Sequence, residues 1–346
     1  MSGGPRMLRL QAGAVHVPVR LRSVVVGGSA LVVAAVLLVV ALGAGTFPVA
    51  PGDVVAALVG VGDDALVETV VREWRLPRAL GALGVGAILG IAGALFQTVT
   101  RNPLASPDIL GLSSGAFTGM LAALVLVSSS WPVLVGGSLI GALATAVVIW
   151  ALAWRGGLQG FRLIVVGIGV SAMLASLNTW MLLQIELETA MFASAWGAGS
   201  LNGVTAPAVA GALACAAPLV VASFALVPRL RQLELGDELA AATGARPHLV
   251  RTLALLVGVV LVAAATTVGG PIAFVALAAP QVGRLIARTP HLSLGLSALV
   301  GAVLLIASDL IAQHVLPAPL PVGVVTVSLG GAYLVLMIVL EVRRRA

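Results

Sequence analysis

The chain has 346 residues, of which 60% are hydrophobic and only 9% are charged. Soluble domains carry charge on about a quarter of their residues, so the composition excludes an ordinary soluble domain. All 19 basic residues are arginines, and the formal net charge is +6. A Walker A phosphate loop and a Schiff base both need lysine, so neither chemistry is available to this chain.

Other chemical roles find no support in the sequence. The single cysteine, Cys215, lies in an apolar run and is expected to be a packing residue. The four histidines are scattered in the tail and the loops, so we expect no metal site and no cofactor. The arginines lie in short loops rather than on one basic face, which argues against a nucleic-acid partner. No nucleophile, base and acid occur together, so catalytic residues are not expected.

Apolar runs of about 20 residues recur along the chain, and each could cross a bilayer. Ten spans are predicted, and the third and eighth are short. The sequence therefore predicts an all-α polytopic membrane protein with spans at about 24–45, 79–99, 112–127, 133–153, 163–184, 206–227, 249–268, 272–286, 292–312 and 322–341.

The arginines predict how the chain is oriented. If the N-terminus is cytoplasmic, ten spans leave only Arg72, Arg75 and Arg78 outside. The positive-inside rule favours this orientation, with both termini in the cytoplasm. Residues 1–23 then form a basic cytoplasmic tail, and residues 24–346 form a single transmembrane domain. A cleaved signal peptide is the alternative, but the run at 24–45 is longer than a usual h-region.

Two spans are interrupted by helix breakers. The second ends at Asn102 and Pro103 with Pro107 close behind, and the seventh ends at Gly269-Gly270-Pro271. Such breaks in corresponding places of two halves are typical of transporters built from inverted repeats. The alternative is that glycine and proline are common in membrane helices. Gly111 and Gly115 follow the first break and predict close helix packing.

Four blocks, in this order, resemble the permease subunits of ABC importers for iron–siderophores, haem and cobalamin. Together they cover nearly the whole chain. They are residues 75–116 (RLPRALGALG…RNPLASPDILGLSSGA), 233–244 (LELGDELAAATG), 270–284 (GPIAFVALAAPQVGR) and 320–330 (LPVGVVTVSLG).

The resemblance implies roles for residues at both ends of the bundle. Arg75 and Arg78 would meet glutamates of an extracytoplasmic substrate-binding protein, although arginines at a helix end can simply snorkel. The loop at about 229–248 would dock into the ATPase subunit, although it could be a solvated connector. The coupling residues would be Leu235, Gly236, Asp237, Glu238, Leu239, Ala242 and Gly244.

The resemblance also implies a cytoplasmic gate in the loop 156–162, with Gly160 and Phe161 at the constriction. Asn178 is a candidate pathway residue, and a hydrogen bond between helices is an equally good role for it. Asp309 is taken as the only acid well inside a span, and its expected role is to hydrogen-bond a neighbouring helix.

The chain departs from the family pattern at three positions. Gln313 stands where arginine is frequent, Leu320 where glutamate precedes Pro-Val-Gly, and Gln281 where histidine follows the proline. A missing outer arginine suggests that this subunit works beside a different permease that keeps the charge.

The sequence thus predicts a transport subunit rather than an enzyme. It would sit in the bacterial cytoplasmic membrane and pass an iron chelate, most often a ferric siderophore, from a binding protein to the cytoplasm. The implied partners are a second permease copy (the same or a different chain), two ATP-binding subunits, the binding protein and the bilayer. The alternatives are a haem or cobalamin permease of the same family and a stand-alone secondary transporter of a small organic solute.

Overall fold

The fold is described from a computed structural model, in which residues 7–12, 15–62, 64–108, 110–154 and 160–345 are described. Seven helical segments of this part are long and apolar enough to cross a membrane, and three shorter apolar helices accompany them. These ten helices overlap the ten predicted spans, and that all ten cross a bilayer stays a prediction. They are α1 (Leu21–Gly43), α4 (Leu76–Thr100), α5 (Leu112–Leu126), α6 (Trp131–Ala153), α7 (Gly160–Leu182), α9 (Ala206–Glu234), α11 (Pro247–Gly269), α12 (Val275–Ala287), α13 (Leu294–Leu310) and α14 (Val322–Arg345).

Several short elements connect the spans. They are the helices α2 (Pro51–Val59), α3 (Ala65–Thr69), α8 (Leu187–Gly197) and α10 (Asp237–Ala242), and the π-helical turns η1 (Val70–Arg75) and η2 (Ile311–Val315). The turn η1 joins α3 to α4 in one continuous helix, and η2 extends α13. These short elements fall below the length that a spanning pattern detects.

The expected N-terminal tail contains a β-hairpin. Strand β1 (Met7–Ala12) pairs antiparallel with β2 (Val15–Arg20), and Met7 lies opposite Arg20. Valine alternates with other residues along β2, and β-branched residues favour strands. The tail prediction therefore missed an ordered hairpin directly before α1.

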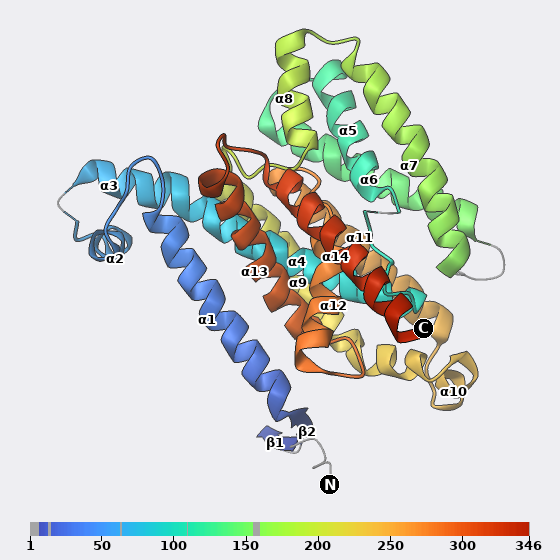
Figure 1. Cartoon of the computed structure of the whole chain (residues 1–346). Coiled ribbons are helices and arrows are strands. Elements are labelled where there is room, and N and C mark those ends of the chain that lie inside the picture. Colours follow the sequence, from blue (N-terminus) through green and yellow to red (C-terminus); the bar gives the residue numbers. More distant parts are fainter. Residues whose placement is uncertain (1–6, 13–14, 63, 109, 155–159, 346) are drawn as a thin grey trace.

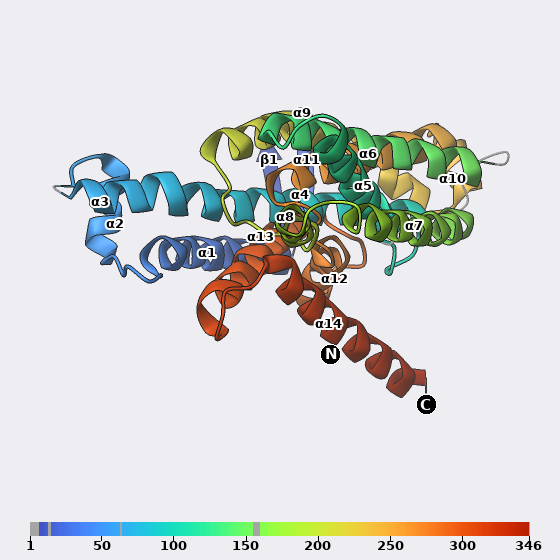
Figure 2. The same cartoon turned by 90° about the horizontal axis from the view of Figure 1, so that it is seen from above.

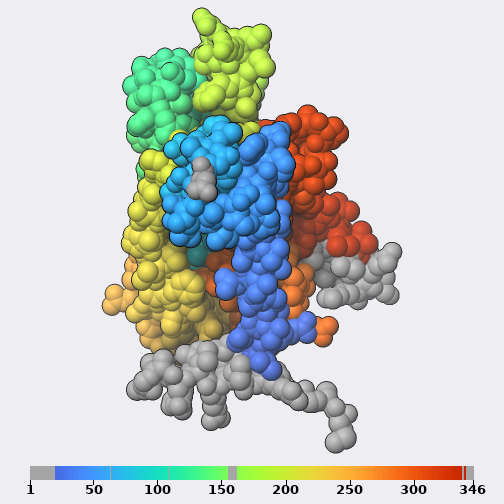
Figure 3. All heavy atoms as spheres, turned by 90° about the vertical axis from the view of Figure 1, so that its left-hand side faces the viewer, coloured from blue at the N-terminus to red at the C-terminus, as the bar shows by residue number. Residues whose placement is uncertain are grey.

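The connecting elements collect at two ends of the bundle (Figures 1 and 2). One end carries the hairpin, α10 and the end of α14, and we call it the inner end. The opposite end carries α2, α3 and α8, and we call it the outer end. Figure 3 shows α2 and α3 as a cap beside the upper part of α1. The names follow the predicted orientation, which stays a prediction.

Helix α4 lies at the centre of the bundle and contacts α9, α11, α12 and α13. Its small residues allow this close packing. Gly86 and Gly90 lie directly against the backbone of α13, and Gly93 lies against α12. A Cβ atom on Gly93 would fall 1.7 Å from the carbonyl oxygen of Ala276. Alanine at this position would force the two helices apart, so glycine is required here.

Helices α5 to α8 form a separate group, which we call the α5–α8 group (Figure 1). It has a small core of its own, made by Met120, Leu121, Leu134, Ala193 and Trp196. Within the group, α5 packs against α6 through Gly115 and Gly119. The group reaches the rest of the bundle mainly through contacts of α5 and α6 with α11.

Candidate functional site

The outer arginines point inward onto the protein. Arg75 donates from Nη1 to the carbonyl oxygen of Leu42 at 2.8 Å and from Nη2 to that of Phe47 at 2.6 Å. Both carbonyls lie at or just beyond the last turn of α1, where a helix leaves carbonyl groups without partners. Arg72 lies further out and pairs with Glu68 one helical turn away. Arg75 therefore fixes the outer end of α1 to α4.

Arg78 makes a bidentate ion pair with an acid on another helix of the bundle. Its Nε and Nη2 atoms each donate to a carboxylate oxygen of Asp309 on α13, both at 2.7 Å. Its Nη1 atom donates to Asn202 Oδ1 at 2.6 Å. Asp309 is nearly buried, with 8% of its side chain exposed. The predicted hydrogen bonding between Asp309 and a neighbouring helix is confirmed, and the donor is Arg78 on α4.

A second acid, Asp108, lies inside the bundle, in the segment between α4 and α5 rather than within a predicted span. Asp108 accepts hydrogen bonds from Ser113 Oγ at 2.9 Å, Ser106 Oγ at 3.1 Å and the backbone N–H of Phe274 at 3.2 Å. Phe274 has φ +69°, an unusual conformation for a bulky residue. Asp108 thus ties the break after α4 to the break between α11 and α12.

Asp108 was not identified from the sequence because residues 101–111 lie between two predicted spans and were interpreted as a connecting loop. In the structure this segment turns back into the bundle, and Ala105, Ser106 and Pro107 are buried. Two serines on either side of an aspartate, in a segment flanked by apolar helices, are the feature that could have marked it. A buried carboxylate needs such donors.

The break after α4 has clear local causes. Arg101 ends the helix in the left-handed region at φ 52°, and Asn102 Oδ1 accepts from the backbone N–H of Leu104. Pro103 follows and is exposed. Gly111 starts α5 with φ +83°, and a Cβ atom there would fall 2.4 Å from Ser171 Oγ. A Cβ atom on Gly115 would fall 2.0 Å from Thr145 Oγ1 on α6.

A groove of about 590 Å³ runs along one face of the bundle between α5, α7 and α14. Asn178 on α7 lines it, and its side chain also bridges to α5. Its Oδ1 accepts from Thr118 Oγ1 at 2.6 Å, and its Nδ2 donates to the Ser114 carbonyl at 3.2 Å. The groove has both apolar and hydroxyl walls, with Ser113, Ser114, Thr179 and Ser328 among its lining residues.

The inner end is tied together by Asp237, the first residue of α10. Arg251 on α11 donates to both of its carboxylate oxygens, at 2.6 and 2.8 Å, and Arg101 at the end of α4 donates at 3.0 Å. Arg101 also donates to the carbonyl oxygen of Leu233 on α9. The Asp237 carboxylate therefore joins α10 to α11 and to the end of α4, and Arg101 links the same point to α9.

The remaining coupling residues surround α10. Leu235 and Leu239 are exposed, while Ala240, which follows Leu239, is buried. Gly236 and Gly244 bracket the helix with φ +107° and +85°, which only glycine adopts easily. Glu238 and Ala242 lie on the exposed surface of α10. The predicted span 206–227 was too short, because α9 continues to Glu234.

The expected gate loop at 156–162 lies largely outside the described residues, which omit 155–159. Gly160 and Phe161 open α7. Among the described residues, no group of three or more histidine, cysteine, aspartate or glutamate side chains could hold a metal ion.

A family model described as the FecCD transport family matches residues 6–340. The chain belongs to this family. The match covers nearly the whole chain, as the four sequence blocks predicted.

Relatives agree with the FecCD assignment. The chain is 46% identical to the ferric enterobactin transport system permease protein FepG of Escherichia coli, over 88% of this chain and 92% of the relative. It is 33% identical to the iron(3+)-hydroxamate import system permease protein FhuG of Bacillus subtilis, over 88% and 93%. These relatives are permeases, so the FecCD chain is a multi-pass transport protein rather than an enzyme.

A solved structure shares the fold. It is assigned to the metal-chelate type of ABC transporter in an inward-facing conformation, and the alignment has a TM-score of 0.77. The two sequences are 24% identical, over 91% of this chain and 99% of that chain.

The three departures from the FecCD pattern have local partners. Gln313 donates to the carbonyl oxygen of Leu320 at 3.2 Å, so two of the departures contact each other in the loop before α14. Gln281 on α12 is buried and donates to Gln97 Oε1 at 2.7 Å, and Gln97 donates to the carbonyl oxygen of Leu277. Neutral amides thus join α4 to α12.

The Asp237 contacts predict a pH-dependent opening of α10. Hydrogen bonds from Arg251 hold the pKa of Asp237 below its ordinary value of 3.8, and Arg101 adds to this effect. A lowered acid pKa stabilises the folded form only while the group is ionised. The stabilisation is therefore complete above pH 3.8 and is lost as the pH falls through the lowered pKa.

We expect the hydrogen-exchange protection of residues 235–244, taken relative to the intrinsic exchange rate at each pH, to be high at neutral pH and to fall on acidification into this range. Asp237→Asn should exchange fast at neutral pH and lose the acid dependence. Equal protection of the wild type and Asp237→Asn at neutral pH would show that the carboxylate does not hold α10.

Proposed function

We propose that this FecCD chain is the permease subunit of an ABC importer that moves a ferric siderophore into the cytoplasm. The observation that carries the proposal is 46% identity with a ferric enterobactin permease along almost the full length of both chains. Several other relatives are named for siderophore or iron(3+) chelate transport. The family match favours this reading over a stand-alone secondary transporter.

The pathway would run along the groove between α5, α7 and α14. This groove is open in a single chain, and Figure 2 shows α14 projecting away from the rest of the bundle. Exposed apolar residues on α14, such as Val327 and Leu336, would be covered by a second permease copy. Two facing grooves would enclose a path with apolar and hydroxyl walls, which suits a large wrapped chelate.

The substrate proposal can be tested by uptake. A strain deleted for this gene and complemented with it is expected to take up radiolabelled ferric enterobactin, with ferric hydroxamate, haem and cobalamin as comparison substrates. The deletion strain itself is the control. Uptake of haem or cobalamin without uptake of any ferric siderophore would contradict the proposal.

Energy would enter through α10, which we propose docks into an ATP-binding subunit. Leu239 lies on this helix with 58% of its surface exposed, and Leu235 lies exposed just before it. Exposed apolar side chains on a helix at the end of a membrane bundle are suited to a protein interface. The Asp237 contacts would pass a displacement of α10 directly to α11 and to the end of α4, and through Arg101 to α9.

Leu239→Asp is expected to abolish co-purification of the ATP-binding subunit and uptake, because a charge would be buried at the interface. Leu66→Asp is a matched control, since Leu66 is 54% exposed on α3 at the outer end. It should leave ATPase association unchanged. Association that survives Leu239→Asp, or that both variants reduce equally, would contradict docking through α10.

At the outer end we propose that Arg75 and Arg78 help to receive the binding protein. Their side chains have partners within the chain, so they would act through the positive potential they add to this surface together with Arg72. Any test must separate that charge from the hydrogen bonds of Arg75 to the end of α1.

Arg75→Glu and Arg75→Met both remove those hydrogen bonds, and only the first reverses the charge. We expect Arg75→Glu to weaken capture of the binding protein well beyond Arg75→Met, measured by surface plasmon resonance on the assembled complex. The difference should shrink at high salt, because charge attraction between surfaces is screened. Equal affinities of the two variants would show that charge at this position does not contribute to docking.

A further inference from the structure

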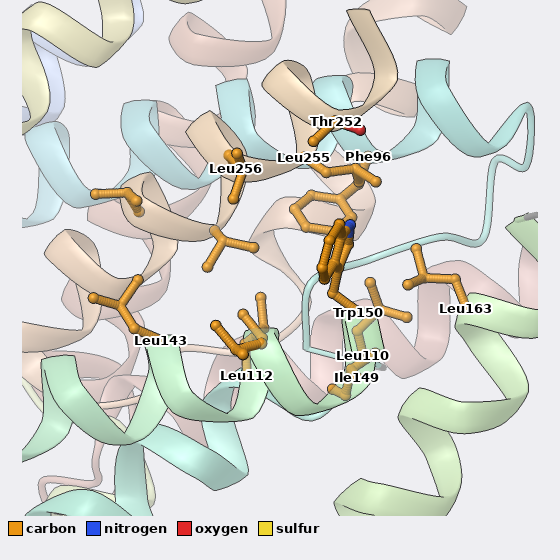
Figure 4. A pocket seen from close by; sticks show the side chains of 14 residues that line it. Phe96, Leu110, Leu112, Leu143, Ile149, Trp150, Leu163, Thr252, Leu255 and Leu256 are labelled. Carbon is orange, nitrogen blue, oxygen red and sulfur yellow. The ribbon is translucent and has the colours of Figure 1, made fainter. Parts of the chain in front are cut away.

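A cavity of about 490 Å³ lies at the seam between the α5–α8 group and the rest of the bundle (Figure 4). Its walls come from α4, α5, α6, α7 and α11. Of its 14 lining residues, 12 are aliphatic or phenylalanine, and Trp150 and Thr252 bring the only polar side-chain atoms. The lining is Phe96, Leu110, Leu112, Leu143, Ala146, Val147, Ile149, Trp150, Leu163, Thr252, Leu255, Leu256, Val259 and Val260.

The cavity has a buried floor and an exposed rim. Phe96, Leu110 and Leu112 are almost completely buried at its floor, whereas Val147 on α6 and Leu256 on α11 are exposed at its rim. Both α6 and α11 are long and apolar enough to span the membrane. The opening between them therefore faces hydrocarbon rather than water.

Neither water nor a second permease copy suits this cavity. An apolar cavity offers water no hydrogen-bond partners and stays dry. Figure 2 shows α6 and α11 on the side of the bundle opposite α14, away from the face proposed to meet the second copy. What surrounds the rim in a membrane is the acyl chains of lipids.

Charged and aromatic groups lie at the inner end of the cavity. Leu163 and Thr252 in the lining are directly preceded by Arg162 and Arg251, and Arg251 is already paired with Asp237. One guanidinium nitrogen of Arg162, Nη1, is buried without a hydrogen-bond partner in the described part of the chain. The ring centroids of Trp150 and Trp154 lie 4.9 Å apart at the end of α6. Arginine binds phosphate, and tryptophan favours the membrane interface.

From these observations we propose that the cavity is a lipid site, which holds one acyl chain of a phospholipid from the leaflet at the inner end. The chain enters between Val147 and Leu256 and lies on the floor made by Phe96 and Leu112. The phosphate lies on the Arg162 side. This lipid is distinct from the transported substrate, and it fills the seam between two groups of helices.

The test uses the assembled transporter in native lipid, washed through detergent and analysed for retained phospholipid by native mass spectrometry. The wild type is expected to retain phospholipid. Val147→Trp should lose most of it, because the indole occupies the rim. Val148→Trp is the matched control, since Val148 is also exposed on α6 but does not line the cavity. It should retain lipid as the wild type does.

A second pair on α11 guards against a folding defect. Leu256→Trp should lose the lipid and Leu253→Trp should keep it, since both leucines are exposed and only Leu256 lines the cavity. A wild-type complex that retains no phospholipid would overturn the proposal. Equal lipid retention by the two variants of each pair would overturn it as well. So would a polypeptide found in place of lipid at the opening between α6 and α11.

Discussion

The architecture depends on the contact between the backbone of α4 and the backbones of α12 and α13. Gly86, Gly90 and Gly93 leave no side chain between the helices at these points. Inside a bilayer apolar side chains gain little by leaving lipid, so close backbone packing must supply much of the attraction between helices. A helix packed in this way has little freedom to tilt or rotate.

Polar contacts occur along the same helix at three levels. Arg78 joins it to Asp309 on α13 at the outer end, Gln97 joins it to Gln281 on α12, and Arg101 joins it to Asp237 at the inner end. The Arg78–Asp309 pair is partly buried and the Gln97–Gln281 pair is buried. A buried polar group that loses its partner is costly. The packing and the polar contacts therefore reinforce each other, and α4 forms a rigid unit with α12 and α13.

The spans could be read from the sequence because hydropathy reports directly on the environment of a helix. The positions of side chains around those helices could not. Arg75 and Arg78 look like outward-facing charges in the sequence, yet their guanidinium groups bind carbonyl oxygens of the α1 end and Asp309. Asp108 looks like a loop residue because the serines near it in the sequence do not by themselves show that the segment before α5 returns into the bundle. Both facts depend on contacts between residues far apart in the chain.

The two kinds of helix contact differ in how much free energy a displacement would cost. Displacing α4 against α12 or α13 would break backbone packing and separate charged or amide partners. Displacing the α5–α8 group against α11 would disturb mainly apolar contacts beside the cavity. The acyl chain of the proposed lipid could fill this cavity in either position, because it is flexible. Asp108 limits this movement, since it holds the segment before α5 to the N–H of Phe274. A displacement of α10 at the inner end would thus move α4 together with α12 and α13. The change in position relative to the α5–α8 group would be accommodated at the seam.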